Sequence, residues 1–248
     1  MQRFARELIA LQPDIILTQN TPNTAALPQQ TRTVPIVLTP GTDPVGGGFV
    51  ASLTRPGGNV TGFINLEASL SSKWLELLRQ IAPRVNRVAF LFNPATASYF
   101  EYYLSPFKAA AAPFGVEPIA APFHNALELV SVFAAQARDP NGGLIAMPFQ
   151  TAHRAEITSL AARHRLPAVY AFRLFAEAGG LLSYGNDRSD NYRGSADYVD
   201  RVLRGAKPGD LPVQFPTKFE MVLNLKTANA LGLTAPPTFL ALANKVIE

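Results

Sequence analysis

The chain contains no cysteine among its 248 residues, and only 16% of its residues are charged. Without cysteine it cannot form disulfides, thiolate metal sites or a cysteine nucleophile. The net charge of +4 comes from basic residues scattered along the chain, with the densest run at 153–165 on one predicted helix. That run is typical of a solvated helix face, whereas nucleic-acid binding requires a clustered basic stripe. We therefore expect no nucleic-acid partner.

Long apolar runs are also missing. No stretch reaches the ~18 consecutive apolar residues of a membrane-spanning helix. Residues 1–11 carry Glu7 and alternate polar with apolar side chains, so they lack the apolar central region of a signal peptide. They predict an amphipathic helix instead, and we expect no export signal in this chain.

The signatures of catalysis are absent as well. The sequence has neither a Gly-x-Ser-x-Gly nucleophile elbow nor a Gly-x-x-x-x-Gly-Lys-Ser/Thr phosphate loop. His153 and His164 fall roughly 16 Å apart along one predicted helix, too far to share a metal. Asp187 and Asp190 come nearest to metal-binding spacing, but Asp190 is typical of a helix cap. We expect no catalytic residue, no metal and no cofactor, and we predict that the chain is not an enzyme.

One glycine-rich segment raises an alternative, a dinucleotide site. Residues 46–51 satisfy Gly-x-Gly-x-x-Ala, and Glu67 follows about 20 residues on, as that fingerprint requires. The glycine turn of such a site must follow a strand immediately and open a long helix. Here residues 40–45 intervene, and the helix can extend only over 49–53 before Pro56. The spacing argues against dinucleotide binding.

Strand and helix patterns alternate along the whole chain, which predicts an α/β fold with parallel sheets flanked by helices. The predicted strands are 14–18, 35–38, 59–64, 87–92, 116–120, 143–147, 167–170, 180–184 and a short one near Val213. The predicted helices are 4–11, 71–81, 98–112, 127–137, 151–164, 172–178, 190–203 and 224–231. We expect two lobes, one of residues 1–64 with 187–210 and one of residues 65–186 with 211–248.

Polar and aromatic residues gather at the carboxyl ends of these strands, where ligands of parallel α/β sheets bind. The candidate ligand-binding residues are Asn20, Thr21, Pro22, Thr42, Asp43, Asn93, Ser98, Phe149, Tyr170, Phe172, Tyr184 and Asn186. If the two sheets face each other across a cleft, these residues line it.

The chemistry of this set favours a small aromatic solute. Helix N-termini near Thr21, Ser98 and Thr151 would direct amide donors to a ligand carboxylate. Asp43 suits an ammonium group, and rings such as Tyr184 can stack on a ligand ring.

Several of the candidates are equally typical of ordinary structure. Asp43 and Asn93 each precede a proline, which is the pattern of a turn. Phe149 and Phe172 can equally be core residues.

Four segments of the chain are distinctive. They are Thr-Asp-Pro-Val-Gly at 42–46, Ser-Leu-Thr-Arg-Pro-Gly-Gly-Asn-Val-Thr-Gly at 52–62, Phe-Ala-Glu-Ala-Gly-Gly-Leu-Leu-Ser-Tyr-Gly at 175–185 and Leu-Arg-Gly-Ala-Lys-Pro-Gly-Asp-Leu-Pro-Val at 203–213. These and other segments resemble, almost residue by residue, the family of periplasmic ABC-transporter substrate-binding proteins that includes tryptophan- and tyrosine-type binders. The resemblance covers essentially the whole chain.

The resemblance implies a two-lobe type I periplasmic-binding fold whose chain crosses between lobes three times. It also implies a periplasmic protein that closes over a small solute, such as an aromatic amino acid or aromatic carboxylate, and delivers it to an ABC permease in the membrane. The alternative is the ligand-sensing domain of a regulator with the same fold.

The first lobe has few predicted elements for such a fold. Family members usually begin with a strand, a helix and a second strand ahead of the point that matches Phe4, after a signal peptide. We therefore expect an N-terminally truncated first lobe that is completed by a partner chain, through self-association, or is partly disordered.

Overall fold

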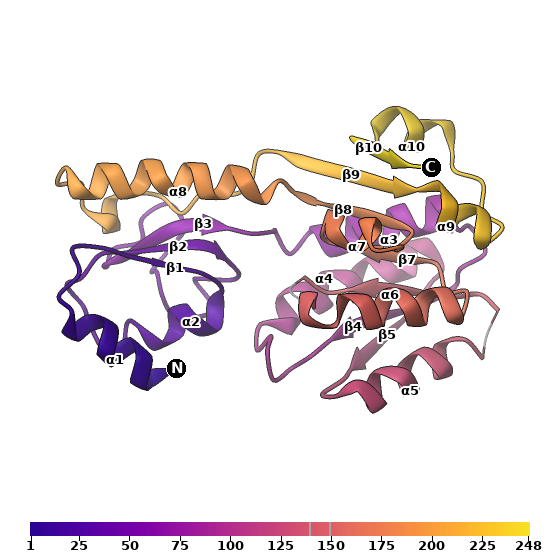
Figure 1. The fold of residues 1–248 in the computed structure, drawn as a ribbon, viewed down its shortest axis with the longest axis horizontal. Helices are drawn as coiled ribbons and strands as arrows, with labels where there is room; N and C mark the ends of the chain where they lie inside the picture. Colours follow the sequence, from indigo (N-terminus) through magenta and orange to yellow (C-terminus); the bar gives the residue numbers. More distant parts are fainter. Residues whose placement is uncertain (139, 149) are drawn as a thin grey trace. The chain divides into compact units, whose positions relative to one another are not determined.

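The computed structural model describes residues 1–138, 140–148 and 150–248 (Figure 1). The chain separates into two compact units. Unit 1 consists of Met1–Glu67 and Asn186–Lys218, and unit 2 consists of Ala68–Gly185 and Phe219–Glu248. The chain therefore passes from one unit to the other after Glu67, after Gly185 and after Lys218.

Unit 1 is built on a parallel sheet in the order β1-β2-β3. Its strands are β1 (Ile16–Thr18), β2 (Ile36–Gly41) and β3 (Val60–Ile64). Its helices are α1 (Gln2–Ala10), α2 (Thr21–Ala26), α8 (Arg188–Leu203) and the short 3-10 helix η3 (Pro208–Asp210).

Helices cover both faces of this sheet (Figure 1). On one face Ala5 of α1 and Ala26 of α2 join Ile16 in a hydrophobic cluster. On the other face Tyr198 and Val202 of α8 pack on Phe63 and Val37. The alternation of side chains along each strand places these two sets on opposite faces.

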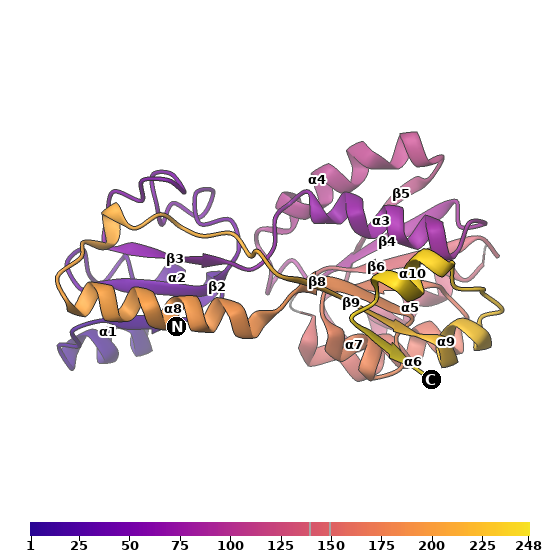
Figure 2. The same cartoon turned by 90° about the horizontal axis from the view of Figure 1, so that it is seen from above.

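Unit 2 holds a larger sheet in the order β10-β9-β8-β7-β6-β4-β5. Its strands are β4 (Arg87–Phe92), β5 (Glu117–Pro122), β6 (Gly142–Ala146), β7 (Ala168–Tyr170), β8 (Leu182–Asn186, whose last residue belongs to unit 1), β9 (Phe219–Asn224) and β10 (Lys245–Ile247). Its helices are α3 (Leu70–Ile81), α4 (Phe100–Ala111), η1 (Ala112–Phe114), α5 (Ala126–Gln136), η2 (Thr151–His153), α6 (Arg154–Arg163), α7 (Arg173–Glu177), α9 (Leu225–Ala230) and α10 (Pro237–Leu242). In Figure 2 α3 and α4 lie on one face of this sheet and α6 and α7 on the other.

Local sequence accounts for where the helices of unit 2 form. Helix α3 buries Leu70, Trp74, Leu78 and Ile81 at the spacing of one helical face, and Pro83 follows its end. The side chain of Asn125 accepts a hydrogen bond from the Glu128 amide at 3.0 Å and so caps α5. The apolar spacing and Pro83 are the patterns that predict α3.

The end of the chain differs from the prediction, which places one strand near Val213 and no strand after it. The residue that pairs there is Gln214, in a single bridge to Phe63. Strands β9 and β10 are additional, and β9 runs antiparallel to β8: Asn224 donates to the Leu181 carbonyl, whereas Lys218 accepts from Asp187. The sheet of unit 2 is therefore mixed rather than purely parallel.

Other expectations need correction in detail. Residues 44–48 form turns, and the predicted helix at 49–53 is absent. Helix α8 is capped by Asp187, whose carboxylate accepts from the Ser189 amide at 2.9 Å, rather than by Asp190. Residues 211–218, expected in the second lobe, group with unit 1 because Val213 packs in its core.

Candidate functional site

The carboxyl ends of β1 and β2 are joined by reciprocal hydrogen bonds. The Thr21 hydroxyl donates to the Thr42 carbonyl at 2.8 Å and accepts from the Thr42 amide at 3.1 Å. Asn20 caps α2, since its side chain accepts from the Asn23 amide at 3.0 Å. Pro22 follows in the first turn of α2 and is exposed. The structure therefore brings these four predicted residues together at one edge of unit 1.

Asp43 is engaged in the turn that follows. Its φ is +46°, and its carboxylate accepts from the Gly46 amide at 2.9 Å. Its side chain is half-buried. The turn that Asp-Pro predicts is therefore present, and it fixes the carboxylate next to the end of β2.

Three side chains of unit 1 are buried but lack hydrogen-bond partners among the described residues. They are the Thr42 hydroxyl and the amides of Asn65 and Asn186. The three residues are 1%, 0% and 2% exposed. Asn65 follows β3 directly, and its backbone amide donates to the Gly41 carbonyl at the end of β2. A buried polar group without a partner costs about 1–3 kcal/mol, which makes these groups candidates for ligand contacts.

Unit 2 presents a second set of such groups. Within the residues that the structure describes, the Ser183 hydroxyl, the Gln150 amide nitrogen and the Tyr170 hydroxyl are buried without a partner. Gln150 follows β6, and Ser183 lies within β8. Hydroxyls and amides both donate and accept, so they can bind a carboxylate or an ammonium group.

The predicted residues after β4 have structural roles. The Asn93 side chain is buried and accepts from the Ala95 amide at 2.9 Å, which forms a turn. Ser98 is exposed, and Tyr99 rather than Ser98 is the cap residue of α4. The predicted cap at Ser98 is therefore wrong, because α4 begins only at Phe100. Phe149 lies outside the described residues.

The predicted aromatic residues differ in surroundings. Tyr170 is buried and stacks on Phe175 with ring centroids 4.9 Å apart, and burial raises the pKa of its hydroxyl. Phe172 is buried at the start of α7. Tyr184 is half-buried and stacks on Phe219 at 5.8 Å. Packing therefore accounts for Tyr170 and Phe172, whereas Tyr184 lines a cavity.

Sequence reasoning missed Asn65, Gln150 and Ser183. Asn65 could have been found by the same rule as Thr42, because it is the first polar residue after a buried strand. Ser183 is a polar residue within an otherwise apolar strand. In the sequence it stands out only as part of segment 175–185, which carries the family resemblance. Gln150 follows Pro148 and carried no distinct signal.

The groups with lowered carboxyl pKa values do not belong to the buried, unpartnered polar side chains of unit 1 or unit 2. The lowered carboxyl pKa values are those of Glu128, which accepts from His124, and of Glu177, which accepts from Lys245 and Arg173. Glu177 forms ion pairs with Arg173 and Lys245, and both carboxylates lie toward the surface. Among residues 1–138, 140–148 and 150–248 there is no cluster of metal-ligating side chains. None of the described helices is long and apolar enough to cross a membrane.

The chain matches one protein family and several known proteins. Residues 1–247 match the family model of ABC transporter substrate binding proteins. A tyrosine-binding protein of Clostridioides difficile is 24% identical over 94% of this chain and 67% of its own length.

Two solved structures share the fold closely. A conserved domain protein from Vibrio cholerae has a TM-score of 0.90 and 30% identity, covering 99% of this chain and 82% of its own. A Streptococcus pneumoniae ABC domain, solved in complex with L-Trp, has a TM-score of 0.90 and 26% identity, covering 99% and 83%.

The fold is the type I periplasmic-binding-protein fold, as the resemblance implied. The matched family consists of solute-binding proteins rather than enzymes. Because the family model spans nearly the whole chain, this chain belongs to the ABC transporter substrate-binding protein family.

Proposed function

We propose that the chain is the solute-binding component of an ABC importer and that its ligand is an aromatic amino acid or a related aromatic carboxylate. The relatives that are named for tyrosine and L-Trp support this ligand class. The observation on which the proposal depends is the set of buried polar side chains without partners among the described residues, above all Thr42 and Asn65 at the strand ends of unit 1 and Ser183 within β8. A ligand that supplies the missing partners offsets their desolvation cost.

A thermal-shift screen tests the ligand class. L-tryptophan, L-tyrosine, L-phenylalanine and indole-3-acetate are compared with ribose and aliphatic amino acids. At a free concentration of 100 times Kd, a ligand that binds only the folded chain stabilises it by about 2.7 kcal/mol. We expect stabilisation by at least one aromatic compound; stabilisation by ribose alone, or by nothing, would contradict the proposal.

The Thr42→Val variant tests the site. Valine keeps the shape of threonine and removes the unpartnered hydroxyl. We expect the ligand-free melting temperature to stay the same or rise, because no internal side-chain bond of that hydroxyl is lost. We expect ligand affinity, measured by isothermal titration calorimetry, to fall by about tenfold, the worth of one hydrogen bond near 1.4 kcal/mol.

Thr61→Val is the matched control. The Thr61 hydroxyl is also buried, but it donates to the Leu211 carbonyl at 2.6 Å. This variant should lose stability and keep its ligand affinity. The reverse pattern, with Thr42→Val destabilised and its affinity unchanged, would remove Thr42 from the site.

We further propose a periplasmic location and delivery of the ligand to a membrane permease, and family membership supports both. Cell fractionation of the native host with an antibody to this chain tests the location. Crosslinking in the same cells tests for a permease next to it. Recovery in the cytosolic fraction would count against both.

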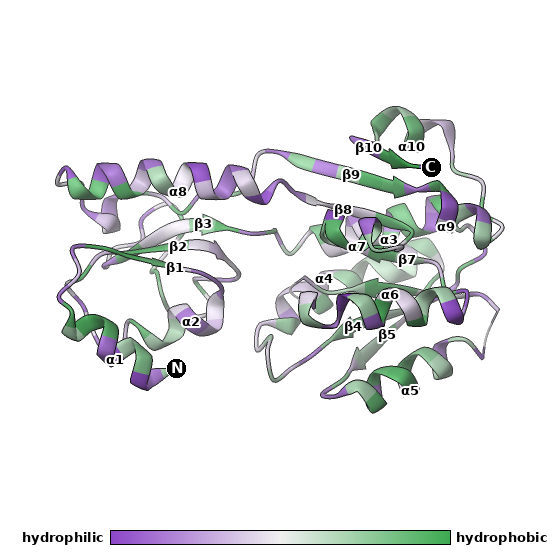
Figure 3. Cartoon of the chain, viewed as in Figure 1, coloured by the Kyte–Doolittle hydropathy of each residue, from purple (hydrophilic) through white to green (hydrophobic). Residues whose placement is uncertain are grey.

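We also propose that unit 1 self-associates. Helix α1 and its C-cap residue expose Phe4, Leu8 and Leu11, which are 61%, 38% and 78% exposed and lie at helical spacing. In Figure 3 green and purple segments alternate along the ribbon of α1. Strand β1 is the edge of its sheet, and its residues 16–18 include no charge or proline to block pairing.

Light scattering coupled to size exclusion measures this association. We expect the average mass to rise above that of a monomer as concentration increases, and the double variant Phe4→Gln, Leu11→Gln to stay monomeric. Leu203→Gln, at another exposed leucine of unit 1, is the control and should associate like the parent chain. A dimer with a dissociation constant of about 1 µM would be almost fully formed at about 100 µM. A parent chain that is still monomeric at that concentration would refute this proposal.

A further inference from the structure

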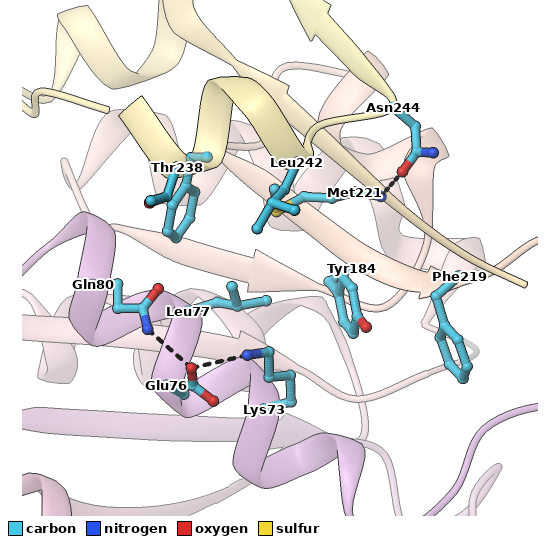
Figure 4. Close-up of a pocket in the computed structure, with 11 residues that line it drawn as sticks. Lys73, Glu76, Leu77, Gln80, Tyr184, Phe219, Met221, Thr238, Leu242 and Asn244 are labelled. Carbon is cyan, nitrogen blue, oxygen red and sulfur yellow. Dashed lines mark hydrogen bonds and ion pairs between the residues drawn. The ribbon is translucent and has the colours of Figure 1, made fainter. Parts of the chain in front are cut away.

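Unit 2 contains a cavity that the proposed function does not use. It has a volume of about 610 Å³ and lies between α3 and α10, over β8 and β9 (Figure 4). The residues lining it are Lys73, Glu76, Leu77, Gln80, Tyr184, Phe219, Met221, Thr238, Phe239, Leu242 and Asn244. All of them belong to unit 2. Its volume is within the range of about 300–1,000 Å³ that is typical of small-molecule sites.

One wall of this cavity, on α3, is polar but electrically balanced. Lys73 Nζ donates to Glu76 Oε1 at 2.8 Å, and Gln80 Nε2 donates to the same oxygen at 2.9 Å. The only two charged side chains among the described lining residues are therefore paired with each other. A charged guest would find no unpaired counter-charge in this wall, and its desolvation would go uncompensated.

The remaining walls are mostly apolar, with Thr238 and Asn244 as their polar members. Leu77 of α3, Met221 of β9 and Leu242 of α10 border the cavity, together with the buried Phe239 of α10. Leu242 is 71% exposed even though it lies next to other apolar side chains. Leu77 and Met221 are themselves buried, and a hollow lined mainly by apolar side chains with a few polar ones is typical of a small-molecule site.

Two aromatic rings lie at one end of the cavity. Tyr184 and Phe219 stack with centroids 5.8 Å apart and planes at 12°. They stand directly beside two of the positions at which the chain passes between units, after Gly185 and after Lys218. The Tyr184 carbonyl accepts from the Trp74 indole at 2.7 Å, which holds this end to α3. A flat ring in the cavity would therefore meet fixed aromatic partners.

From this lining we infer that the cavity between α3 and α10 is a second binding site, for an uncharged, ring-containing apolar small molecule. The inference stands apart from the proposed function, because it uses none of the unpartnered polar groups at the strand ends. A molecule bound here contacts both connecting strands, β8 and β9, through Tyr184 and Phe219.

The test is a fluorescence titration of the full chain with N-phenyl-1-naphthylamine, an uncharged aromatic probe that brightens in apolar surroundings. We expect saturable binding at one site. Leu242→Lys places a charge at the rim of the cavity and should weaken probe binding by about tenfold or more, since an unpaired ammonium opposes an apolar guest. Thr238→Arg, at a second exposed lining position, should act in the same direction.

Leu240→Lys is the matched control. Leu240 is on the same helix and is 46% exposed, but it does not line the cavity. The Leu240→Lys variant should bind the probe with an affinity within about twofold of the parent value, which is well short of a tenfold change. The inference would be overturned if Leu242→Lys and Leu240→Lys weakened probe binding equally, or if neither variant weakened it.

Competition with L-tryptophan separates the two sites. If L-tryptophan displaces the probe competitively, the probe occupies the amino-acid site and the inference fails. If L-tryptophan does not bind at all, the proposed function fails, while the comparison of Leu242→Lys with Leu240→Lys still decides the second site.

Discussion

Replacing Gly62 with alanine is expected to unfold unit 1 or to destabilise it by on the order of 4 kcal/mol or more. Gly62 lies in β3 with φ of +141°, a region that side chains rarely adopt. A Cβ atom there would lie 2.0 Å from the Leu38 carbonyl oxygen and 2.6 Å from its nitrogen.

The clash at Gly62 cannot be relieved by moving a side chain. Both contacts are with the backbone of Leu38, which is the residue of β2 that pairs with Gly62. Strand β2 is the central strand of the sheet, so a shift there would disturb the pairing with β1 as well. The backbone of unit 1 therefore has little freedom to accept even one methyl group.

Urea denaturation followed by circular dichroism measures this effect. The control is Gly58→Ala, because Gly58 has no positive φ and a Cβ there meets nothing within 4 Å. The control should stay within about 1 kcal/mol of the parent, or gain slightly from a stiffer unfolded chain. A Gly62→Ala chain as stable as Gly58→Ala would show that this register of β2 and β3 is wrong.

Trp74→Ala is expected to remove about 3–5 kcal/mol of stability from unit 2. Trp74 is the single tryptophan of the chain and is 0% exposed. Its ring lies 5.9 Å from that of Tyr103, and its indole nitrogen donates to the Tyr184 carbonyl at 2.7 Å. Alanine would leave a large cavity between α3, α4 and β8, together with a carbonyl that has lost its donor.

Two further variants separate the contributions of Trp74. Trp74→Phe keeps most of the ring and loses the hydrogen bond, so it should cost about 1–3 kcal/mol. Leu127→Ala removes a side chain that is 81% exposed, and it should change stability by about 0.5 kcal/mol or less.

Differential scanning calorimetry supplies the measurement, since each 1 kcal/mol corresponds to roughly 2–4 °C in a chain of this size. Equal melting temperatures for Trp74→Ala and Leu127→Ala would mean that Trp74 is not in the core. Loss of the Trp74 contacts is expected to lower the stability of unit 2 more than that of unit 1, because the ring lies within unit 2.

Sequence pattern was sufficient where local chemistry decides structure. The face of α3 that carries Trp74 and Leu78 could be read from the spacing of its apolar residues. Pro83 marked its end. The alternation of such strands and helices indicated an α/β fold, because parallel strands need crossover helices.

Sequence pattern failed where the structure of a segment depends on its neighbours. Residues 245–247 form β10 only because β9 lies beside them, and so short a segment has no pattern of its own. Leu17 belongs to an apolar run that predicted a buried strand, yet it is 54% exposed. It lies on the edge strand, whereas the packing of α8 is on β2 and β3 through Val37 and Phe63.

The sequence by itself determined the fold class and the edge of each sheet at which polar residues gather, because both follow from the order of residues along the chain. Only the tertiary structure decided which of those residues are candidates for ligand contacts. Asn93 and Asp43 accept bonds within their own turns, whereas the hydroxyls of Thr42 and Ser183 are buried without a partner among the described residues. Whether a polar atom is satisfied depends on atoms brought to it from distant parts of the chain, and residue order does not specify that.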